Sequence, residues 1–241
     1  MPLLPESWLP KILFIDVDGT ITDSSRILVP EALTALKKLE DAGVMIGIAT
    51  GNVRPIAWNL TRMIGLSGPV VSENGGVVWV PQLNKLQVLA NGKRAKDAAY
   101  WLGTQMPDLD PVGIESNEWR ESEWCLRSNE DLEKIKINLS NSKWKDMDVV
   151  KTGFAIHIAE PGLNKGEGIR IACRWLDIPL ENVCAIGDAP NDIPMFETCG
   201  WSVAVGGATD DAKNSAKVVS QKDRGFAVAE LCEEWISRLS Q

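Results

Sequence analysis

The stretch that decides the fold is Lys11–Thr22, KILFIDVDGTIT. Its first part, Ile12–Ile15, is a short run of apolar, strand-forming residues, which is typical of a strand buried on both faces of a parallel sheet. The run ends in Asp16 and Asp18, and Gly19 then breaks the strand. Because parallel sheets bind ligands at the carboxyl ends of their strands, the stretch predicts two carboxylates at a ligand-binding edge. A solvated turn of the same composition is the alternative.

Length and composition indicate a globular protein with one large domain or two modest ones. The 241 residues are 44% hydrophobic and 24% charged, which is enough apolar material for a sizeable core. The formal net charge is −8. A nucleic-acid-binding surface needs a basic stripe, so no nucleic-acid partner is expected. An acidic protein that binds an anion must make its binding site locally positive.

The cysteines and the first residues bear on the compartment. The five cysteines are widely spaced and lie mostly in apolar stretches, as expected for free thiols in a reducing compartment: Cys125, Cys173, Cys184, Cys199 and Cys232. The opening MPLLPESWLPK has no basic region and contains prolines, so it is not read as a secretory signal. No apolar run reaches membrane-spanning length. We therefore expect a cytoplasmic monomer or homodimer with no membrane partner.

Strands and helices alternate at both ends of the chain. The predicted strands are Ile12–Ile15, Val44–Ala49, Pro69–Ser72, Val183–Gly187 and Trp201–Val205, with a hairpin over Val77–Val80 and Lys85–Leu89. The predicted helices between and after them are Pro30–Ala42, Pro55–Ile64, Lys165–Leu176, Ile193–Thr198 and Phe226–Leu239. This rhythm predicts an α/β fold with a Rossmann-like, doubly wound parallel sheet.

The middle of the chain breaks this rhythm. A helix is predicted over Gly92–Met106, another begins at Ser128, and Asp148–Ala159 reads as one strand. Between them, Ile114–Arg127 shows no clear period. We therefore predict that residues 85–159 form an inserted α+β domain and that residues 1–84 and 160–241 form the core.

Three of the predicted parallel strands end in polar residues, which should meet at one edge of the sheet. Asp16 and Asp18 follow the first strand, and the other two strands end in Thr50-Gly51-Asn52 and in Asp188-Ala189-Pro190-Asn191-Asp192. Clustered carboxylates raise one another's pKa unless a cation lies among them. An all-oxygen site suits Mg²⁺, which binds substrate phosphate, and Lys165 adds a fixed positive charge. The constellation therefore predicts a magnesium-dependent site for a phosphoryl group.

These motifs resemble those of a known family. DVDGT at 16–20, Thr50-Gly51-Asn52, Asn164-Lys165-Gly166 and GDAPND at 187–192 are similar to the four motifs of the haloacid dehalogenase-like superfamily, in the same order. The insertion lies between the second and third motifs, as in the type-two cap of that family. Within the superfamily the chain most resembles the archaeal-type phosphoglycolate phosphatases, near the sucrose-phosphate phosphatase branch.

The resemblance implies roles for the first two motifs. Asp16 matches the nucleophile that attacks phosphorus and forms an aspartyl phosphate. Asp18 matches the general acid/base, and its backbone carbonyl is expected to bind the metal. Thr50 matches a residue that holds the phosphoryl oxygens, and Gly51 and Asn52 belong to the same phosphate-binding motif.

The resemblance likewise implies roles for the last two motifs. Lys165 matches a second residue that holds the phosphoryl oxygens. Asp188 matches a direct Mg²⁺ ligand, and Asp192 matches either a ligand or a residue that supports the ligands. Asn191 matches a group that binds or orients the phosphoryl group.

The expected activity is magnesium-dependent hydrolysis of a small phosphorylated metabolite, with 2-phosphoglycolate as the favoured substrate. A sugar-phosphate phosphatase similar to sucrose-phosphate phosphatase is one alternative, and a phosphomannomutase-like enzyme, which shares the DVDGT start and a similar cap, is another. A non-catalytic phosphate-binding regulatory protein belongs to a different class. Such proteins usually lack the nucleophile or the acid, whereas Asp16 and Asp18 are both present here.

Two residues of the insertion stand out. Arg120, in the charged run Glu115–Glu123, is a candidate for binding a substrate carboxylate, because arginine matches carboxylates bidentately. A solvated loop is the alternative for this run. His157 is the only histidine, and its place on an alternating strand favours a structural role over catalysis.

Overall fold

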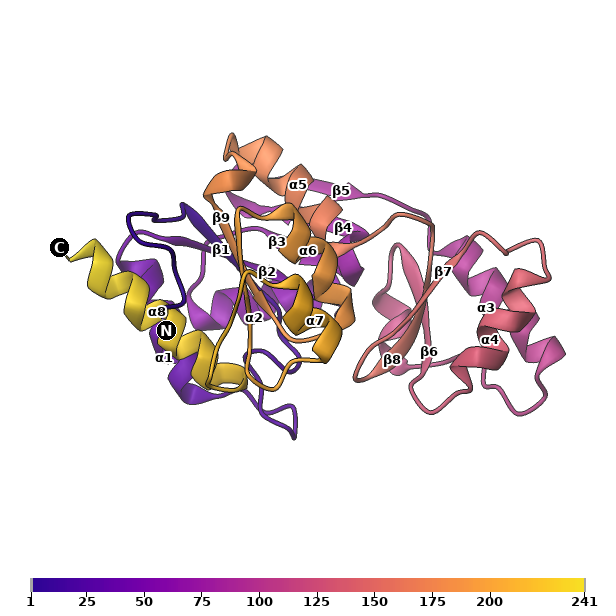
Figure 1. The fold of residues 1–241 in the computed structure, drawn as a ribbon. Coiled ribbons are helices and arrows are strands. Elements are labelled where there is room, and N and C mark those ends of the chain that lie inside the picture. The colour runs from indigo at the N-terminus through magenta and orange to yellow at the C-terminus, as the bar shows by residue number, and fades with distance from the viewer. Residues whose placement is uncertain (1, 241) are drawn as a thin grey trace.

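The computed structural model describes residues 2–240 and contains two bodies side by side, between which the chain crosses twice (Figure 1). The larger body holds an eight-stranded sheet with the order β11-β10-β9-β1-β2-β3-β4-β5. Its strands are β1 (Ile12–Ile15), β2 (Met45–Ala49), β3 (Val70–Ser72), β4 (Val77–Val80), β5 (Lys85–Val88), β9 (Val183–Gly187), β10 (Trp201–Ala204) and β11 (Val218–Val219). All neighbours from β11 to β3 are parallel, and β4 and β5 add antiparallel strands at one edge.

Helices cover both faces of this sheet (Figure 1). The group α1, α2 and α8 packs together, and the group α5, α6 and α7 packs together. Their bounds are α1 (Pro30–Asp41), α2 (Arg54–Ile64), α5 (Lys165–Leu176), α6 (Ile193–Thr198), α7 (Asp210–Ser215) and α8 (Arg224–Leu239). Every residue of β1 is fully inaccessible, as expected for a strand covered on both faces. The predicted doubly wound α/β fold is confirmed.

The register of the three central strands fixes where the site lies. Ile15 of β1 pairs with Ile48 of β2 on one side and with Ile186 of β9 on the other. The three strands therefore end at the same level. The polar segments that follow them must meet at this edge of the sheet.

The smaller body contains the antiparallel sheet β6-β8-β7, formed by β6 (Glu123–Arg127), β8 (Ala155–Ala159) and β7 (Asp148–Lys151). The helices α3 (Lys93–Gln105) and α4 (Leu132–Ser140) lie on the far side of this sheet from the larger body (Figure 1). Ile156 and Ile158 are buried in a second apolar cluster with these helices. Because side chains alternate along a strand, His157 lies on the opposite face of the sheet.

The structure corrects three details of the sequence-based prediction. β5, predicted to begin the insertion at residue 85, pairs with β4 in the large sheet, so the chain leaves that sheet only after Val88. The strand predicted over Asp148–Ala159 is two antiparallel strands separated by a turn at Thr152–Phe154, where Gly153 interrupts the strand pattern. Phe154 therefore lies in that turn. The helix α7, capped by Thr209, was not predicted.

Two further observations concern the cysteines and the character of the helices. All five cysteines are buried free thiols. None of the helices between residues 2 and 240 combines the length and the apolar character that crossing a membrane requires.

Candidate active site

The carboxyl edge of the central strands holds a cavity of about 250 Å³. Asp16 and Asp18 follow β1, and Asp188 follows β9. The cavity is lined by residues of both bodies: Asp16, Asp18, Gly19, Asp23, Ser24, Arg26, Gly51, Thr152, Gly153, Phe154, Asp188, Ala189, Asn191 and Arg224. Residues of three predicted motifs, widely separated in the sequence, thus lie around one small space.

Lys165 lies in the first turn of α5, and its fully buried ammonium group bridges two carboxylates. Its Nζ donates to Oδ1 of Asp16 at 2.5 Å and to Oδ1 of Asp192 at 2.6 Å. Burial alone lowers the pKa of Lys165, but the neighbouring Asp16 and Asp192 outweigh it and raise the net pKa above its ordinary value. The third predicted motif therefore places a permanent positive charge beside Asp16.

Asp192 is held by protein donors on both of its oxygens. Besides Lys165 on Oδ1, the backbone N–H groups of Asp188 and Ala189 donate to Oδ2 at 2.8 and 2.9 Å. These bonds fold the loop after β9 back on itself. The geometry favours a supporting function for Asp192, which is one of the two roles that the resemblance implies.

The carboxylates of Asp16, Asp188 and Asp192 form a cluster whose ligand atoms lie within 4.8 Å of one another. Burial, followed by repulsion from Asp192, raises the pKa of Asp188 to about 6. Burial also raises the pKa of Asp16 well above its usual value, although Lys165 acts in the opposite direction. A divalent cation would offset the unfavourable burial and mutual repulsion of these carboxylates, and the all-oxygen donor set suits Mg²⁺. The residues present therefore fit a magnesium ion.

Gly19 allows Asp188 to approach the turn after β1. Its φ of +88° lies in the left-handed region, and a Cβ atom at this position would lie 2.4 Å from Oδ2 of Asp188. The hydroxyl of Thr20 donates to Oδ1 of Asp188 at 3.0 Å. The Gly-Thr pair of the DVDGT motif thus makes room for the Asp188 carboxylate and orients it.

The Asp18 carboxylate is held on both sides. Nδ2 of Asn52 donates to Oδ2 at 2.6 Å, and Nε of Arg26 donates to Oδ1 at 2.9 Å. Asn52 also donates to the hydroxyl of Thr50 at 3.2 Å. The second predicted motif therefore orients Asp18, a contact that the resemblance did not assign to Asn52.

Arg120 lies near the site but does not line the cavity. Its side chain is fully buried, and Nη1 donates to the carbonyl of Gly51 at 3.1 Å and to the Glu123 carboxylate. Nε and Nη2 have no hydrogen-bond partner among the described residues. Because the fully buried Arg120 guanidinium does not line the site cavity, the geometry does not favour the predicted contact with a substrate carboxylate.

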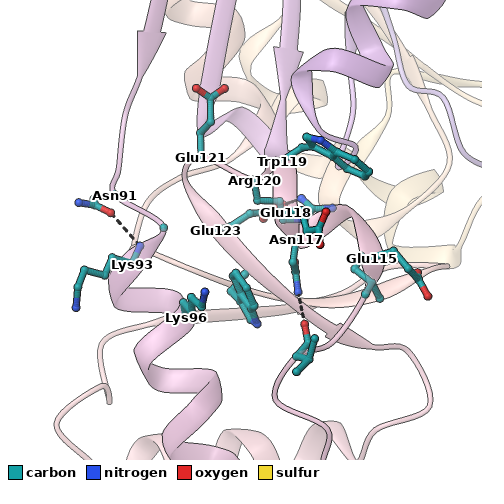
Figure 2. Close-up of a pocket in the computed structure, with 14 residues that line it drawn as sticks. Asn91, Lys93, Lys96, Glu115, Asn117, Glu118, Trp119, Arg120, Glu121 and Glu123 are labelled. Atoms are coloured by element: carbon teal, nitrogen blue, oxygen red, sulfur yellow. Dashed lines mark hydrogen bonds and ion pairs between the residues drawn. The ribbon is translucent and has the colours of Figure 1, made fainter.

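A larger cavity, of about 590 Å³, lies within the smaller body, between the start of α3 and the 3₁₀ turn Glu115–Trp119 (Figure 2). The ammonium group of Lys96 lies 4.7 Å from the ring centroid of Trp124 on its wall. None of the clustered aspartates borders it, so its size does not make it the site of the predicted chemistry.

A seam of buried polar contacts joins the two bodies beside the site. The Glu73 carboxylate accepts bonds from the backbone N–H groups of Glu121 and Ser122 and from the Ser122 hydroxyl, at 2.8 to 3.1 Å. Nearby, Asn74 lies 3.1 Å from Nδ1 of His157 and accepts a bond of 3.0 Å from Asn191. Sequence reasoning missed Glu73 and Asn74. Their only signal was a polar turn, Glu73-Asn74-Gly75-Gly76, directly after a buried strand.

His157 forms part of the same seam. It is buried, and its Nδ1 lies 2.9 Å from Glu123 and 3.1 Å from the Cys125 sulfur, while Nε2 lies 3.0 Å from the Thr152 hydroxyl. It does not line the site cavity. These contacts favour the structural role predicted for it.

Glu73 offers a direct test of the seam. Glu73→Ala should lower the free energy of unfolding by about 1–3 kcal/mol, because it leaves the two buried donors of Ser122 and the partly buried N–H of Glu121 without an acceptor. Urea denaturation followed by tryptophan fluorescence measures this difference. The exposed Glu118 provides the matched control, since Glu118→Ala should change stability by less than about 0.5 kcal/mol. Equal stability of the two variants would contradict the account of the seam.

Comparison with known proteins agrees with this architecture. The haloacid dehalogenase-like hydrolase family matches residues 13–104 and 115–231. A protein of Methanothermobacter thermautotrophicus named phosphoglycolate phosphatase is 35% identical over 227 residues, covering 94% of this chain and 99% of its own. A protein of Haloarcula marismortui with the same name is 34% identical, covering 88% of this chain and 92% of its own.

Solved structures show the same fold. A Thermoplasma acidophilum protein superimposes with a TM-score of 0.85 at 22% identity, covering 95% of this chain and 99% of its own. A haloacid dehalogenase-like hydrolase from Bacteroides thetaiotaomicron superimposes with a TM-score of 0.77 at 18% identity, covering 93% and 98%. The match to the family spans both bodies, and the four motifs that suggested it lie around or directly behind one cavity. The chain therefore belongs to the haloacid dehalogenase-like hydrolases.

Proposed function

We propose that this protein is a magnesium-dependent phosphatase that hydrolyses 2-phosphoglycolate to glycolate and phosphate. The observation that carries the proposal is the buried Lys165 between Asp16 and Asp192, next to Asp188. This arrangement supplies a carboxylate nucleophile, a fixed positive charge and a set of oxygen ligands in one place. The cavity of about 250 Å³ is small, and the relatives at 34–35% identity bear the name phosphoglycolate phosphatase.

The reaction runs in two displacements on this chain's own residues. The Asp16 carboxylate attacks phosphorus, the bond from phosphorus to the ester oxygen breaks, and Asp18 gives that oxygen its proton, so that glycolate leaves. Asp18 then takes a proton from a water molecule that attacks the aspartyl phosphate, which restores Asp16 and releases phosphate. Splitting the reaction in this way replaces one difficult displacement by two easier ones.

The remaining residues hold and neutralise the phosphoryl group. Thr50, the backbone of Gly51, Lys165 and Asn191 contact its oxygens, and Asn52 orients Asp18. Asp16, Asp188 and the backbone carbonyl of Asp18 would hold Mg²⁺, while Asp192 fixes the loop and Lys165. When bound, Mg²⁺ neutralises the negative charge of the phosphoryl group. Residues 89–159 act as the cap, which separates the closed site from bulk solvent.

Phosphate release from a panel of esters tests the proposal. We expect release that requires Mg²⁺ and stops in excess EDTA, with the highest kcat/KM for 2-phosphoglycolate among that compound, sucrose 6-phosphate, mannose 1-phosphate and p-nitrophenyl phosphate. A preference for a sugar phosphate would instead support the sugar-phosphate phosphatase or phosphomannomutase-like alternative. Absence of any release in Mg²⁺ would support the non-catalytic regulatory protein.

Asp188→Asn tests the metal site without relying on turnover. In EDTA the variant should be at least as stable as wild type, because it removes a buried charge whose pKa is raised by burial and by Asp192. Mg²⁺ should raise the Tm of wild type, since it binds only the folded state, but not that of the variant. The exposed Asp97 provides the control, and Asp97→Asn should respond to Mg²⁺ as wild type does. An unchanged Mg²⁺ response in Asp188→Asn would place the metal elsewhere.

A further inference from the structure

We propose that Arg26 recognises the carboxylate of the substrate and that it exchanges its present partner, Asp18, for that carboxylate when the substrate binds. This inference rests on the proposed function and names the group that selects the substrate. Neither the motifs nor the family resemblance assigned a role to Arg26, which lies in the loop between β1 and α1.

The backbone around Arg26 is fixed. Oδ1 of Asp23 accepts bonds from the N–H groups of Ser25 and Ile27 at 2.8 and 2.9 Å, and the N–H of Arg26 donates to the Asp23 carbonyl at 3.1 Å. Arg26 itself has a φ of +63°, in the left-handed region that non-glycine residues rarely adopt. The turn thus holds an unfavourable conformation that directs the Arg26 side chain to the cavity, which it lines.

The Arg26 guanidinium lies between the two bodies and has unused donors. Nε bonds Asp18, and the guanidinium carbon lies 5.1 Å from the centroid of the Phe154 ring in the turn between β7 and β8. The side chain is 54% exposed, and its Nη1 and Nη2 atoms make no hydrogen bond to any residue of the described chain. Arg26 therefore retains a pair of donors that can bind a further carboxylate.

The chemistry of the substrate places its carboxylate near Arg26. In 2-phosphoglycolate a single methylene separates the carboxylate from the ester oxygen to which Asp18 gives its proton. The carboxylate must therefore lie close to any side chain that contacts Asp18. Arg26 makes such a contact through its Nε, whereas Asn52 on the other side of Asp18 carries no charge.

Charge favours Arg26 over the other two arginines near the site. The described wall of the cavity holds four carboxylates and two arginines, Arg26 and Arg224, so an incoming carboxylate needs a cation. Arg224 is paired with its neighbour Asp223 at 3.2 Å, whereas the partner of Arg26 is Asp18, the residue assigned to the leaving oxygen. Arg120 has a fully buried side chain bonded to Glu123 and does not line the cavity.

The exchange has a consequence for catalysis. While Arg26 binds Asp18, the Asp18 carboxylate is held away from the leaving oxygen. A substrate carboxylate gives Arg26 another partner and frees Asp18, whereas an ester without a carboxylate leaves the pair intact. Binding of the substrate carboxylate by Arg26 should therefore raise kcat as well as lower KM.

The experiment compares Arg26→Ala with wild type on 2-phosphoglycolate and on p-nitrophenyl phosphate, which has no carboxylate. We expect the ratio of the two kcat/KM values to shift against 2-phosphoglycolate by about 30- to 10³-fold. For Arg26→Lys this ratio should lie between those of wild type and Arg26→Ala, because lysine keeps the charge but lacks the paired donors of the guanidinium. The exposed Arg62, which stacks on Trp58, provides the matched control, and Arg62→Ala should leave the ratio unchanged.

Two results would overturn the proposal. One is an equal loss of kcat/KM on both substrates in Arg26→Ala. The other is a loss of kcat/KM confined to 2-phosphoglycolate that appears in Arg120→Ala or Arg224→Ala but not in Arg26→Ala. Calorimetry on the Asp16→Asn background separates this inference from the proposed function. There Arg26→Ala should weaken binding of 2-phosphoglycolate but not of inorganic phosphate, even if wild type hydrolyses neither ester. Equal binding of 2-phosphoglycolate with and without Arg26 would also overturn it.

Discussion

Asp16→Asn should reduce turnover by about 10⁴-fold or more while the protein remains folded. The amide that replaces the carboxylate is a poor nucleophile, so no aspartyl phosphate forms. The new side chain has nearly the same volume, and its oxygen still accepts the bond that Lys165 donates to Oδ1. Steady-state phosphate release measures the loss, and circular dichroism reports on the fold.

The exposed Asp41 on α1 provides the isosteric control for this variant. Asp41→Asn removes only its ion pair with Lys37 and should retain full activity. Turnover by a well-folded Asp16→Asn variant at more than a few per cent of the Asp41→Asn rate would contradict covalent catalysis by Asp16.

Lys165→Met should have the largest effect on stability as well as a strong effect on activity. The substitution leaves Asp16 and Asp192 buried without their shared cation, which should cost about 3–5 kcal/mol of unfolding free energy in EDTA. Loss of the charge beside the phosphoryl group should reduce kcat by about 10²- to 10³-fold. Lys37→Met, at an exposed ion pair on α1, should change stability by less than about 1 kcal/mol.

A double variant separates these two roles of Lys165. Lys165→Met/Asp192→Asn removes one of the two uncompensated carboxylates, so it should regain part of the lost stability while activity stays low. The phosphoryl group still lacks its cation in this variant. Recovery of activity together with stability would show that Lys165 acts only as a structural partner of Asp192.

The sequence carried enough information to predict the central sheet and the cluster at its edge. Ile12–Ile15 is uniformly apolar because both of its faces are covered, and this pattern is readable without a structure. Parallel strands end at one level, so the motifs after β1, β2 and β9 had to meet there. The place of Lys165 beside Asp16 was expected instead from its positive charge and from the family resemblance, because Lys165 begins α5 and follows no strand of the large sheet.

The contacts between the two bodies were not predictable in the same way. They depend on how the smaller body sits on the larger one, and no periodicity encodes that relation. Glu73, Asn74 and Arg26 lie in turns, where a polar residue is the ordinary choice for solvation and carries no signal of a partner. Arg120 was singled out by its residue type, whereas the structure shows its guanidinium bonded to Glu123.

Mass spectrometry of the acid-quenched enzyme tests the central claim most directly. Wild type mixed with 2-phosphoglycolate and Mg²⁺, then quenched in acid within the first turnovers, should carry an added mass of about 80 Da, the mass expected of a covalent phosphoryl intermediate. After proteolysis the addition should lie on the peptide that contains Asp16, and it should be absent without Mg²⁺ and in Asp16→Asn. Product release with no such addition under conditions where the intermediate accumulates, or an addition on another residue, would contradict the account.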